Sequence, residues 1–398
     1  MFTCYRNDYL RLAHVVIQAI MAKTTIAEDF LPPFKLDHII RLTDSTGIVQ
    51  HATYGIPNYY EGYCLDDNAR ALLMAIMAYR QLKDETALGY IPTYLAYIRY
   101  AQNADGTFRN FMAFNRNFLD EIGSEDAFGR AIWAIGYAVA YAPKDAYFRA
   151  ARELFMRAIP HFERLRSIRS VANTILGLCH YLHAHPADDG LLALTRKLAS
   201  RLYNEYAIHR HDDWHWYESL LAYDNALLPL AMMRAGNLLN DKAFRDVGYE
   251  SMAFLTKHTL KKGHLSIIGN AEWFRRHGIP SRFDQQPIDA MAMVLLLQQA
   301  YRDTGIPDHL HAMVTAHRWF LGENDLQICL YDPETGGCCD GLQADGVNHN
   351  QGAESALAYL ISHLSVQQAL DTRVDCTVLK ETDEDRNISS HRLANSAP

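Results

Sequence analysis

The chain has 398 residues, of which 49% are hydrophobic and 21% are charged, and its formal net charge is −8 at pH 7. This is the composition of a folded globular protein, and an acidic balance without a long basic stretch argues against nucleic acid as a partner. No apolar run reaches the roughly 18 residues needed to span a bilayer, so no membrane partner is expected. The seven cysteines form neither a disulfide framework nor a zinc array, which predicts free thiols and a cytoplasmic protein.

In chain order, the predicted elements alternate between two kinds of helix. Helices of the first kind have one polar and one apolar stripe, which is typical of a helix with one solvated face. They are expected at residues 9–22, 95–103, 146–159, 191–206, 243–258 and 309–322. The first of them carries charges before a short apolar stretch, so we interpret it as an amphipathic helix and not as a signal peptide.

Helices of the second kind lie between them, are apolar nearly all round and begin in a similar way. Their first residues are NARALLMA, FGRAIWAI, VANTILGL, YDNALLPL, PIDAMAMV and GAESALAY. Each places a polar residue before a small one, and the polar residues are Arg70, Arg130, Asn173, Asn225, Asp289 and Glu354. The small residues would let these helices approach one another closely around a narrow axis.

Six inner helices alternating with six outer helices predict an all-α fold, an (α/α)6 toroid. An α-solenoid is the alternative, because it stacks similar helix pairs without closing into a ring. The common register of the polar heads and the absence of obvious capping repeats favour closure. The toroid is expected to form one domain over residues 1–365, followed by a flexible polar tail over residues 366–398.

Long loops rich in glycine and aromatic residues lead into five of the six inner helices, whereas the links that leave them are mostly short. These loops span residues 47–67, 105–126, 209–225, 263–289 and 330–355. Long decorated loops on one side of a scaffold mark its functional face. Several of them alternate in the manner of short hairpins.

A cluster of polar residues stands at the head of the first inner helix, in YCLDDNARALLMAIMAYR (63–80). Asp66 lies four residues before Arg70 and Asp126 lies four residues before Arg130, so each pair shares a helix face. Helix capping explains any single one of these acids. It does not explain polar residues at one register on otherwise apolar helices, because buried charge needs a partner or a ligand. The pattern therefore predicts a polar floor beneath a cavity.

This arrangement resembles the (α/α)6-barrel carbohydrate-active enzymes, which include many inverting glycosidases, the N-acylglucosamine 2-epimerases and the unsaturated glucuronyl hydrolases. The stretches LTDSTGIVQHATYGIPNYYEGYCLDDNARALL and NQGAESALAYL are similar to an all-helical domain found beside or fused to bacterial glycosyltransferases. The resemblance extends to about residue 365. The resemblance implies a bacterial protein, an oligosaccharide or polysaccharide substrate and a glycosyltransferase partner. It does not assign a catalytic role to any residue of this sequence.

Inverting glycoside hydrolysis needs two carboxyl groups about 6.5–9.5 Å apart, one acting as acid and the other as base. Neighbouring inner helices would lie about 8–10 Å apart, so acids on adjacent repeats suit this reaction. The candidate catalytic residues are Asp66, Asp67, Asp126, Asp289 and Glu354. Acids expected to be of second rank are Glu125, Glu218, Asp224 and Asp284.

Substrate binding is expected from polar side chains at the helix heads and from aromatic rings in the loops, because aromatic faces stack on the apolar faces of sugars. Arginines could hold an acid in its ionised form or bind an acidic sugar. The candidate binding residues are Tyr63, Asn68, Arg70, Arg130, Asn173, Trp214, Trp216, Asn225 and Trp273.

Two other functions stay open beside the inverting hydrolase, which the sequence favours. A sugar epimerase or isomerase would use histidines as acid and base, and His51, His215, His277 and His349 lie in the decorated loops. A glycan-binding accessory module of a glycosyltransferase pathway would have no catalytic residues. No metal and no cofactor is expected, because HRHDDWHW (209–216) lacks zinc-ligand spacing and no Walker A or GxGxxG motif is present.

Overall fold

The computed structural model describes residues 30–261 and 263–372. The chain divides into two compact units, residues 1–33 and 34–398, and the fold below is that of the second unit. The predicted outer helix at 9–22 and residues 373–398 of the predicted tail lie outside the described residues.

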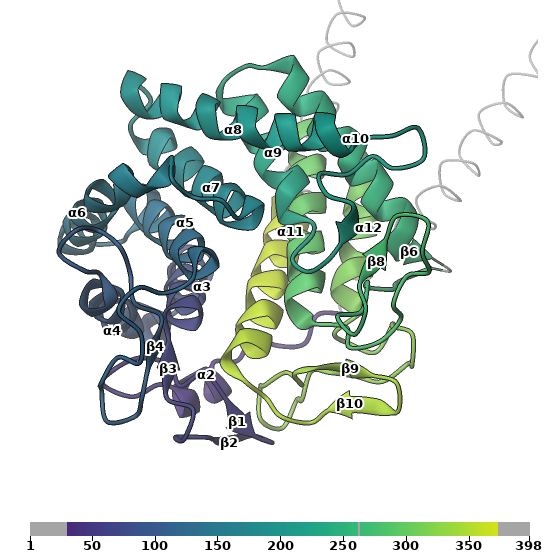
Figure 1. The fold of residues 1–398 in the computed structure, drawn as a ribbon. Coiled ribbons are helices and arrows are strands. Elements are labelled where there is room, and N and C mark those ends of the chain that lie inside the picture. The colour runs from purple at the N-terminus through teal and green to yellow at the C-terminus, as the bar shows by residue number, and fades with distance from the viewer. Residues whose placement is uncertain (1–29, 262, 373–398) are drawn as a thin grey trace, which may run out of the picture. The chain divides into compact units, whose positions relative to one another are not determined.

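The inner helices begin where the aligned polar residues predict. They are α3 (Leu65–Leu82), α5 (Glu125–Tyr141), α7 (Ile168–Ala184), α9 (Leu227–Leu238), α11 (Pro287–Thr304) and a final helix over residues 353–372 (Figure 1). Small residues bring them close together. A Cβ atom added at Gly136 of α5 would lie only 2.2 Å from the carbonyl oxygen of Gly177 in α7, so the α5–α7 contact requires glycine on both helices.

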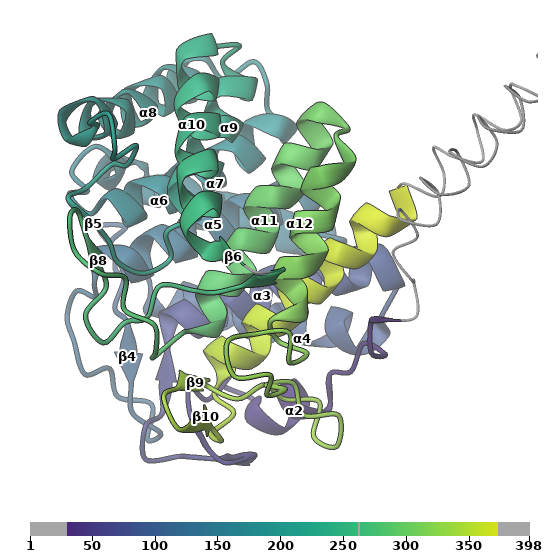
Figure 2. The same cartoon turned by 90° about the vertical axis from the view of Figure 1, so that its right-hand side faces the viewer.

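The outer helices described are α4 (Glu85–Ala101), α6 (Asp145–Phe162), α8 (Asp189–His209), α10 (Lys242–Thr259) and α12 (Pro307–Arg318) (Figure 2). Aspartate caps start three of them. Asp84, Asp188 and Asp241 accept hydrogen bonds from backbone N–H groups in the first turns of α4, α8 and α10. Each outer helix buries one face and leaves the other in solvent, as the stripe pattern predicts.

Bonds between the first and last inner helices close the ring. Arg70 of α3 lies 2.8 Å from Glu354 at the head of the final helix. On the other side of that helix, Gln298 of α11 donates a hydrogen bond of 2.9 Å to the carbonyl of Ser365. The fold is therefore the predicted (α/α)6 toroid and not an open solenoid.

The strands described form two-stranded antiparallel sheets in the long loops. Three pairs are local hairpins, as predicted: β1 (Ala52–Thr53) with β2 (Ile56–Pro57), β6 (Leu260–Lys261) with β7 (His264–Leu265), and β9 (Gly341–Gln343) with β10 (Gly346–Asn348). Two pairs join loops of different repeats: β3 (Tyr63–Cys64) with β4 (Phe111–Met112), and β5 (Leu220–Leu221) with β8 (Phe274–Arg275). The strands β1–β4, β9 and β10 gather at one end, at the bottom of Figure 1.

The final helix continues through residue 372, past the predicted boundary at residue 365. A short helix, α2 (Asp37–Leu42), precedes β1. Among the helices of the described residues, none combines the length and the apolar character that crossing a bilayer would require.

Candidate active site at the heads of the inner helices

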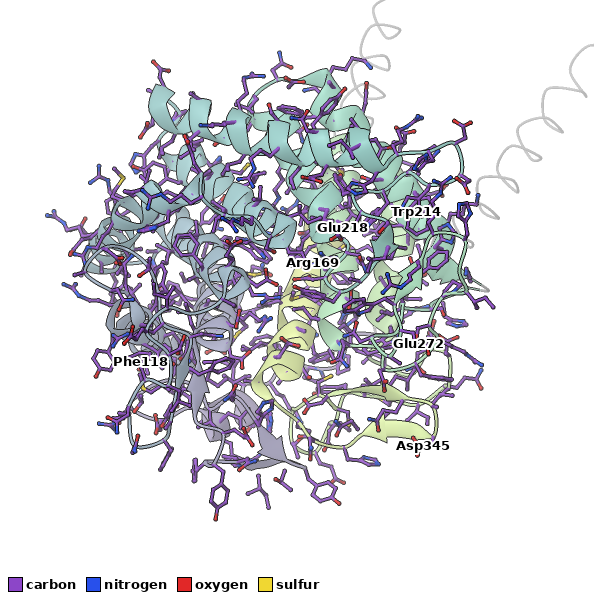
Figure 3. All side chains as sticks on the ribbon, in the orientation of Figure 1. Phe118, Arg169, Trp214, Glu218, Glu272 and Asp345 are labelled. Carbon is purple, nitrogen blue, oxygen red and sulfur yellow. The ribbon has the colours of Figure 1, made fainter. Side chains whose placement is uncertain are left out.

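The aligned polar residues lie in or beside the first turns of the inner helices, at the end of the ring from which the long loops project. Arg70, Asn173, Asn225 and Asp289 are buried, whereas the Glu354 side chain is 42% exposed. Figure 3 shows Arg169 of α7 and Glu218 of the loop before α9 close together at this end. The sequence pattern therefore locates a polar floor at one end of the ring.

Arg70 joins two carboxylates. Its Nη1 donates a hydrogen bond of 2.8 Å to Asp67 Oδ1, and its Nη2 lies 2.8 Å from Glu354 Oε2. The second oxygen of Asp67 accepts a hydrogen bond from the Cys64 thiol at 3.0 Å. One buried guanidinium thus brings acids of the first and last inner helices close to one another.

These acids line a cavity of about 300 Å³ that opens to solvent. That volume is at the lower end of the range of roughly 300–1,000 Å³ for ligand pockets. The ionisable side chains of its wall are His51, Cys64, Asp66, Asp67, Arg70, Asp340 and Glu354, beside the ring of Phe111. The lining therefore includes four acids, one arginine and one exposed aromatic ring.

A second arginine holds Asp66. Arg130 Nη1 lies 2.9 Å from Asp66 Oδ1, and its Nη2 lies 3.3 Å from Asp224 Oδ2. Asn110 donates a further hydrogen bond of 3.3 Å to Asp66. Burial alone would raise the pKa of Asp66, but Arg130 and Arg70 bring it below its ordinary value. Asp66 is therefore ionised at neutral pH.

Asp67 has the opposite shift. Burial raises its pKa to about 6; Arg70 opposes this increase and the charge of Glu354 adds to it. The side chain of Asp67 is only 6% exposed, yet it lines the cavity. Asp67 can therefore be protonated or ionised near neutral pH, which suits a general acid or base.

The head of α3 has no side-chain cap, so neither Asp66 nor Asp67 serves as its N-cap. Ser124, in contrast, caps α5 by accepting a hydrogen bond from the N–H of Ala127. Capping therefore accounts for the start of α5 but not for the two aspartates of α3.

Two other candidate acids, Asp126 and Asp289, do not line this cavity. Asp126 accepts hydrogen bonds from Ser167 at 2.7 Å and from the Tyr223 hydroxyl, so it anchors the start of α7. Burial and the charge of Asp224 raise the pKa of Asp289 to about 8. Asp289 is therefore protonated at neutral pH beneath the floor.

Three of the four second-rank acids have clear partners, and Asp224 is the one already described beside Arg130. Glu218 pairs with Arg169 at 2.9 Å. Glu125 accepts hydrogen bonds of 2.6 Å from the backbone N–H groups of Arg166 and Ser167, which fixes the entry to α7. Asp284 lies in a loop with a positive φ of 60°.

The predicted aromatic contacts are wrong for three residues. Trp214 is 2% exposed and Trp216 is 0% exposed, and both pack against Phe254. Tyr63 is 1% exposed and donates its hydroxyl hydrogen to Asp44 at 2.6 Å. Rings packed in the core cannot stack on a sugar. Trp273 is half-buried in the loop before β8.

The candidate binding asparagines make hydrogen bonds to buried backbone groups. Asn68 accepts a hydrogen bond from the N–H of Ile48 at 3.0 Å and donates one to the carbonyl of Cys64 at 2.8 Å. Asn225 closes a turn with Ala222 in the same manner. Asn173 donates to the carbonyl of Arg169. These amides fix loops and helix heads beneath the cavity.

Two residues of the site were missed. Arg169 stands four residues before Asn173, the spacing that relates Asp66 to Arg70, so the same register could have revealed it. Asp340 accepts hydrogen bonds from the N–H of Gly352 at 2.7 Å and from Ser355 at 2.8 Å, and burial raises its pKa. Asp340 lies in a loop and not on a helix, so no repeating spacing in the sequence indicates that it belongs to the site.

The histidine-rich loop uses its side chains in ion pairs. His215 lies 2.8 Å from Glu250, and Asp213 lies 2.7 Å from Arg276. Over residues 30–261 and 263–372, no group of three His, Cys, Asp or Glu side chains is placed to hold a metal ion.

No family model matches the chain, and no curated protein is similar to it in sequence. Among solved structures, the cellobiose 2-epimerase from Spirochaeta thermophila has a TM-score of 0.65 and 13% identity, covering 90% of this chain and 98% of the epimerase. The GH76 α-mannanase from Bacteroides thetaiotaomicron has a TM-score of 0.58 and 10% identity, covering 85% and 94%. An inactive variant of the α-1,6-mannanase from Salegentibacter, in complex with α-1,6-mannotetrose, has a TM-score of 0.56 and 13% identity, covering 84% and 96%. The chain therefore has the (α/α)6-barrel fold of these carbohydrate-active enzymes.

Proposed function

We propose that the chain is an enzyme that hydrolyses a glycosidic bond in the cavity at the heads of α3 and the final helix. The observation that carries this proposal is the pair of carboxyl groups on Arg70. Asp67 is buried with a pKa of about 6, and Glu354 is half-exposed and paired with the guanidinium. Two carboxyl groups in different environments are the arrangement that glycoside hydrolysis uses.

In this proposal Asp67 is the general acid and donates a proton to the leaving oxygen of the glycosidic bond. Glu354 is the general base and takes a proton from the attacking water, which inverts the anomeric carbon. Arg70 positions both groups. Asp66, held ionised by Arg130, stabilises the positive charge that develops on the sugar ring in the transition state.

The cavity suits a short part of a larger glycan. Its volume of about 300 Å³ and its open mouth would admit a sugar ring while the rest of the chain extends into solvent. Phe111, whose side chain is 45% exposed, offers a ring on the cavity wall. The mannanase complex with mannotetrose supports an oligosaccharide as the substrate class.

The compartment and the partner belong to the same proposal. Five cysteines of the described residues are free, which agrees with a reducing, cytoplasmic environment. A glycosyltransferase of the same glycan pathway is the partner that the sequence resemblance implies.

Turnover of a glycan panel, followed by NMR, tests the proposal. The panel includes cellobiose and α-1,6-mannotetraose, and the variants are Asp67→Asn and Glu354→Gln. Each variant should lose at least about 10²-fold in rate, the low end for general acid–base catalysis. Asp126→Asn is the matched control, because it changes a helix-head carboxyl outside the cavity wall. Full turnover by both cavity variants would contradict the proposal, and glycan binding without turnover by the parent protein would favour the accessory module.

A sugar epimerase is the second candidate, and the TM-score of 0.65 with a cellobiose 2-epimerase favours it. Such an enzyme would use histidines as acid and base, as the sequence analysis expects. Among the described residues, however, His51 is the only histidine that lines the cavity. The same NMR assay separates the two reactions, because an epimerase yields a new isomer with the glycosidic bond intact.

A further inference from the structure

A second cavity lies on the axis of the ring, towards the C-terminal ends of the inner helices. Its volume is about 230 Å³, and all six inner helices contribute to it. Its polar lining includes Arg80 of α3, Tyr137 and Tyr141 of α5, His180 of α7, Arg234 of α9, and Arg302 of α11. It therefore lies at the end of the ring opposite the candidate active site.

An apolar layer separates the two cavities. Leu73, Trp133 and Ile361 line the second cavity, and together with Met291 they also surround a void of only about 10 Å³. Arg70 lines that void on the side of the candidate active site. A ligand in the second cavity would therefore be separated from the acids of the first.

The three arginines of the second cavity have neutral partners. Arg234 donates hydrogen bonds to Gln299 at 3.0 Å and to His180 at 2.9 Å. Arg80 donates to the Tyr137 hydroxyl at 3.3 Å, and its guanidinium lies 3.8 Å from the centre of the Tyr141 ring. The third arginine, Arg302, donates to the amide oxygen of Gln368.

No carboxylate of the described residues lies within 4.0 Å of Arg80, Arg234 or Arg302. The nearby Asp303 is bound instead by Gln299 at 2.7 Å and by Asn237 at 2.9 Å. At the candidate active site, by contrast, Arg70, Arg130 and Arg169 are all paired with carboxylates. The second cavity thus gathers three arginines that no carboxylate of residues 30–261 and 263–372 contacts directly.

The surroundings of Arg234 and Arg302 disfavour the charged forms of both side chains. Burial lowers the pKa of Arg234, and partial burial at the rim together with Arg234 lowers the pKa of Arg302 to about 10, although the charge of the nearby Asp303 opposes both decreases. Burial and the same arginines hold the pKa of His180 well below its ordinary value, so His180 is neutral and accepts the hydrogen bond from Arg234. The partial negative charge at each helix C-terminus favours these cations, but it provides no counter-ion inside the cavity.

We propose that this second cavity binds the phosphate group of a small ligand, either inorganic phosphate or a phosphate monoester. Guanidinium groups bind phosphate oxygens through paired, charge-assisted hydrogen bonds, and three of them here converge on one small volume. The hydroxyl of Tyr137 adds a hydrogen-bond donor, and its ring and that of Tyr141 can contact the group esterified to the phosphate. This site is independent of the proposed hydrolase reaction.

Isothermal titration calorimetry on the full chain tests the site, with inorganic phosphate and glucose 6-phosphate as separate probes at constant ionic strength. We expect one bound molecule per chain for at least one probe. A stronger signal for the ester would identify a sugar phosphate as the ligand, and a stronger signal for phosphate would identify the free ion. Both results support the site.

The variants Arg234→Gln and Arg302→Gln should each weaken binding at least about tenfold, because each removes a charge-assisted hydrogen bond. Arg149→Gln is the control, since Arg149 is an exposed arginine on the outer helix α6 and should leave binding unchanged. Thermal unfolding checks that each variant is folded. If Arg234→Gln unfolds, Arg302→Gln decides alone, because its side chain lies at the exposed rim. Failure of both probes to bind at millimolar concentration, or unchanged binding by a folded Arg302→Gln variant, would overturn the proposal.

Discussion

Asp66 and Asp67 are consecutive residues of one helix turn, yet their surroundings shift their pKa values in opposite directions. Arg130 and Arg70 outweigh the effect of burial at Asp66, whereas burial dominates at Asp67. The difference arises because Asp66 binds Arg130 directly while Asp67 shares Arg70 with Glu354. Environments that separate two carboxyl groups in this way assign one as the acid and leave the other ionised.

The first prediction concerns the pH dependence of turnover. If Asp67 is the general acid, it must be protonated, so kcat/KM should fall about tenfold per pH unit above its pKa of about 6. The measurement is a pH profile on the substrate found in the glycan panel. The residual activity of Asp67→Asn should lack this decrease. A decrease that persists unchanged in Asp67→Asn would assign the titrating group to another residue.

The second prediction concerns stability. The pKa of Asp289 is about 8 in the folded chain, above its ordinary value, so the folded state holds a proton that the unfolded state releases. The contribution of Asp289 to the free energy of unfolding, taken as the difference between the parent and the Asp289→Asn variant, should therefore decrease by up to roughly 1.4 kcal/mol per pH unit from about pH 4 to about pH 8. Asp289→Asn should remove this decrease and be more stable than the parent at pH 8, as measured by urea unfolding.

Asp66→Asn is the matched control, with the opposite sign. The pKa of Asp66 is lowered on folding, so its ionised form stabilises the protein above its unfolded pKa, and this contribution is lost as the pH falls through the folded value. The asparagine variant should be less stable than the parent at neutral pH. Equal pH dependence in both variants and the parent would refute the environments described for the two acids.

At the residue scale, the sequence predicts positions better than roles. The aligned polar residues near the starts of the inner helices predict that Arg70, Arg130, Asp289 and Glu354 lie at one end of the ring. This is possible because the helical period fixes which residues share a face. It could not show that Trp214 and Trp216 are buried, because their burial depends on the distant Phe254.

Among the elements, the contact between α5 and α7 depends on glycine. A Cβ atom added at Gly136 would lie 2.2 Å from the carbonyl oxygen of Gly177, and one added at Gly177 would lie 2.4 Å from the carbonyl oxygen of Ile132. Neither helix backbone can move without disturbing its neighbours in the ring. Two inner helices are therefore fixed at a short distance.

The third prediction follows from this contact. Gly136→Ala should lower the free energy of unfolding by about 1–3 kcal/mol, the usual cost of overpacking a core. Gly89→Ala is the control, because Gly89 lies on the exposed face of α4 with nothing within 4 Å of an added Cβ. That substitution should stabilise the chain by about 0.5–1 kcal/mol, since alanine favours a helix. Chemical denaturation measures both, and a neutral Gly136→Ala would show that the helices can separate.

The inner helices were easier to predict than the outer ones. Their apolar runs and polar heads define both the type of element and its start. The outer helix α4 begins at Glu85, well before the predicted segment 95–103. The pattern does not reveal its first half, because Gly89 and Pro92 interrupt the helical periodicity there. Pairs such as β3 with β4 link two separate loops, and pairing between distant segments leaves no local signal.

At the scale of the ring unit, residues 34–372, closure gives two ends with different side chains around one axis. The N-terminal heads of the inner helices hold the acids of the candidate active site, and the region near their C-terminal ends holds the three arginines of the second cavity. Only a closed ring places residues of all six inner helices around one axis. The long loops at the first end then determine which ligands reach the acids.

A crystal structure of the Asp67→Asn variant with the oligosaccharide identified in the glycan panel tests the proposed hydrolase site most directly. We expect a sugar ring in the cavity between α3 and the final helix, with the amide of residue 67 and the carboxylate of Glu354 both within hydrogen-bonding distance of the glycosidic bond or its attacking water. A glycan bound elsewhere on the chain, with this cavity filled only by water, would contradict it.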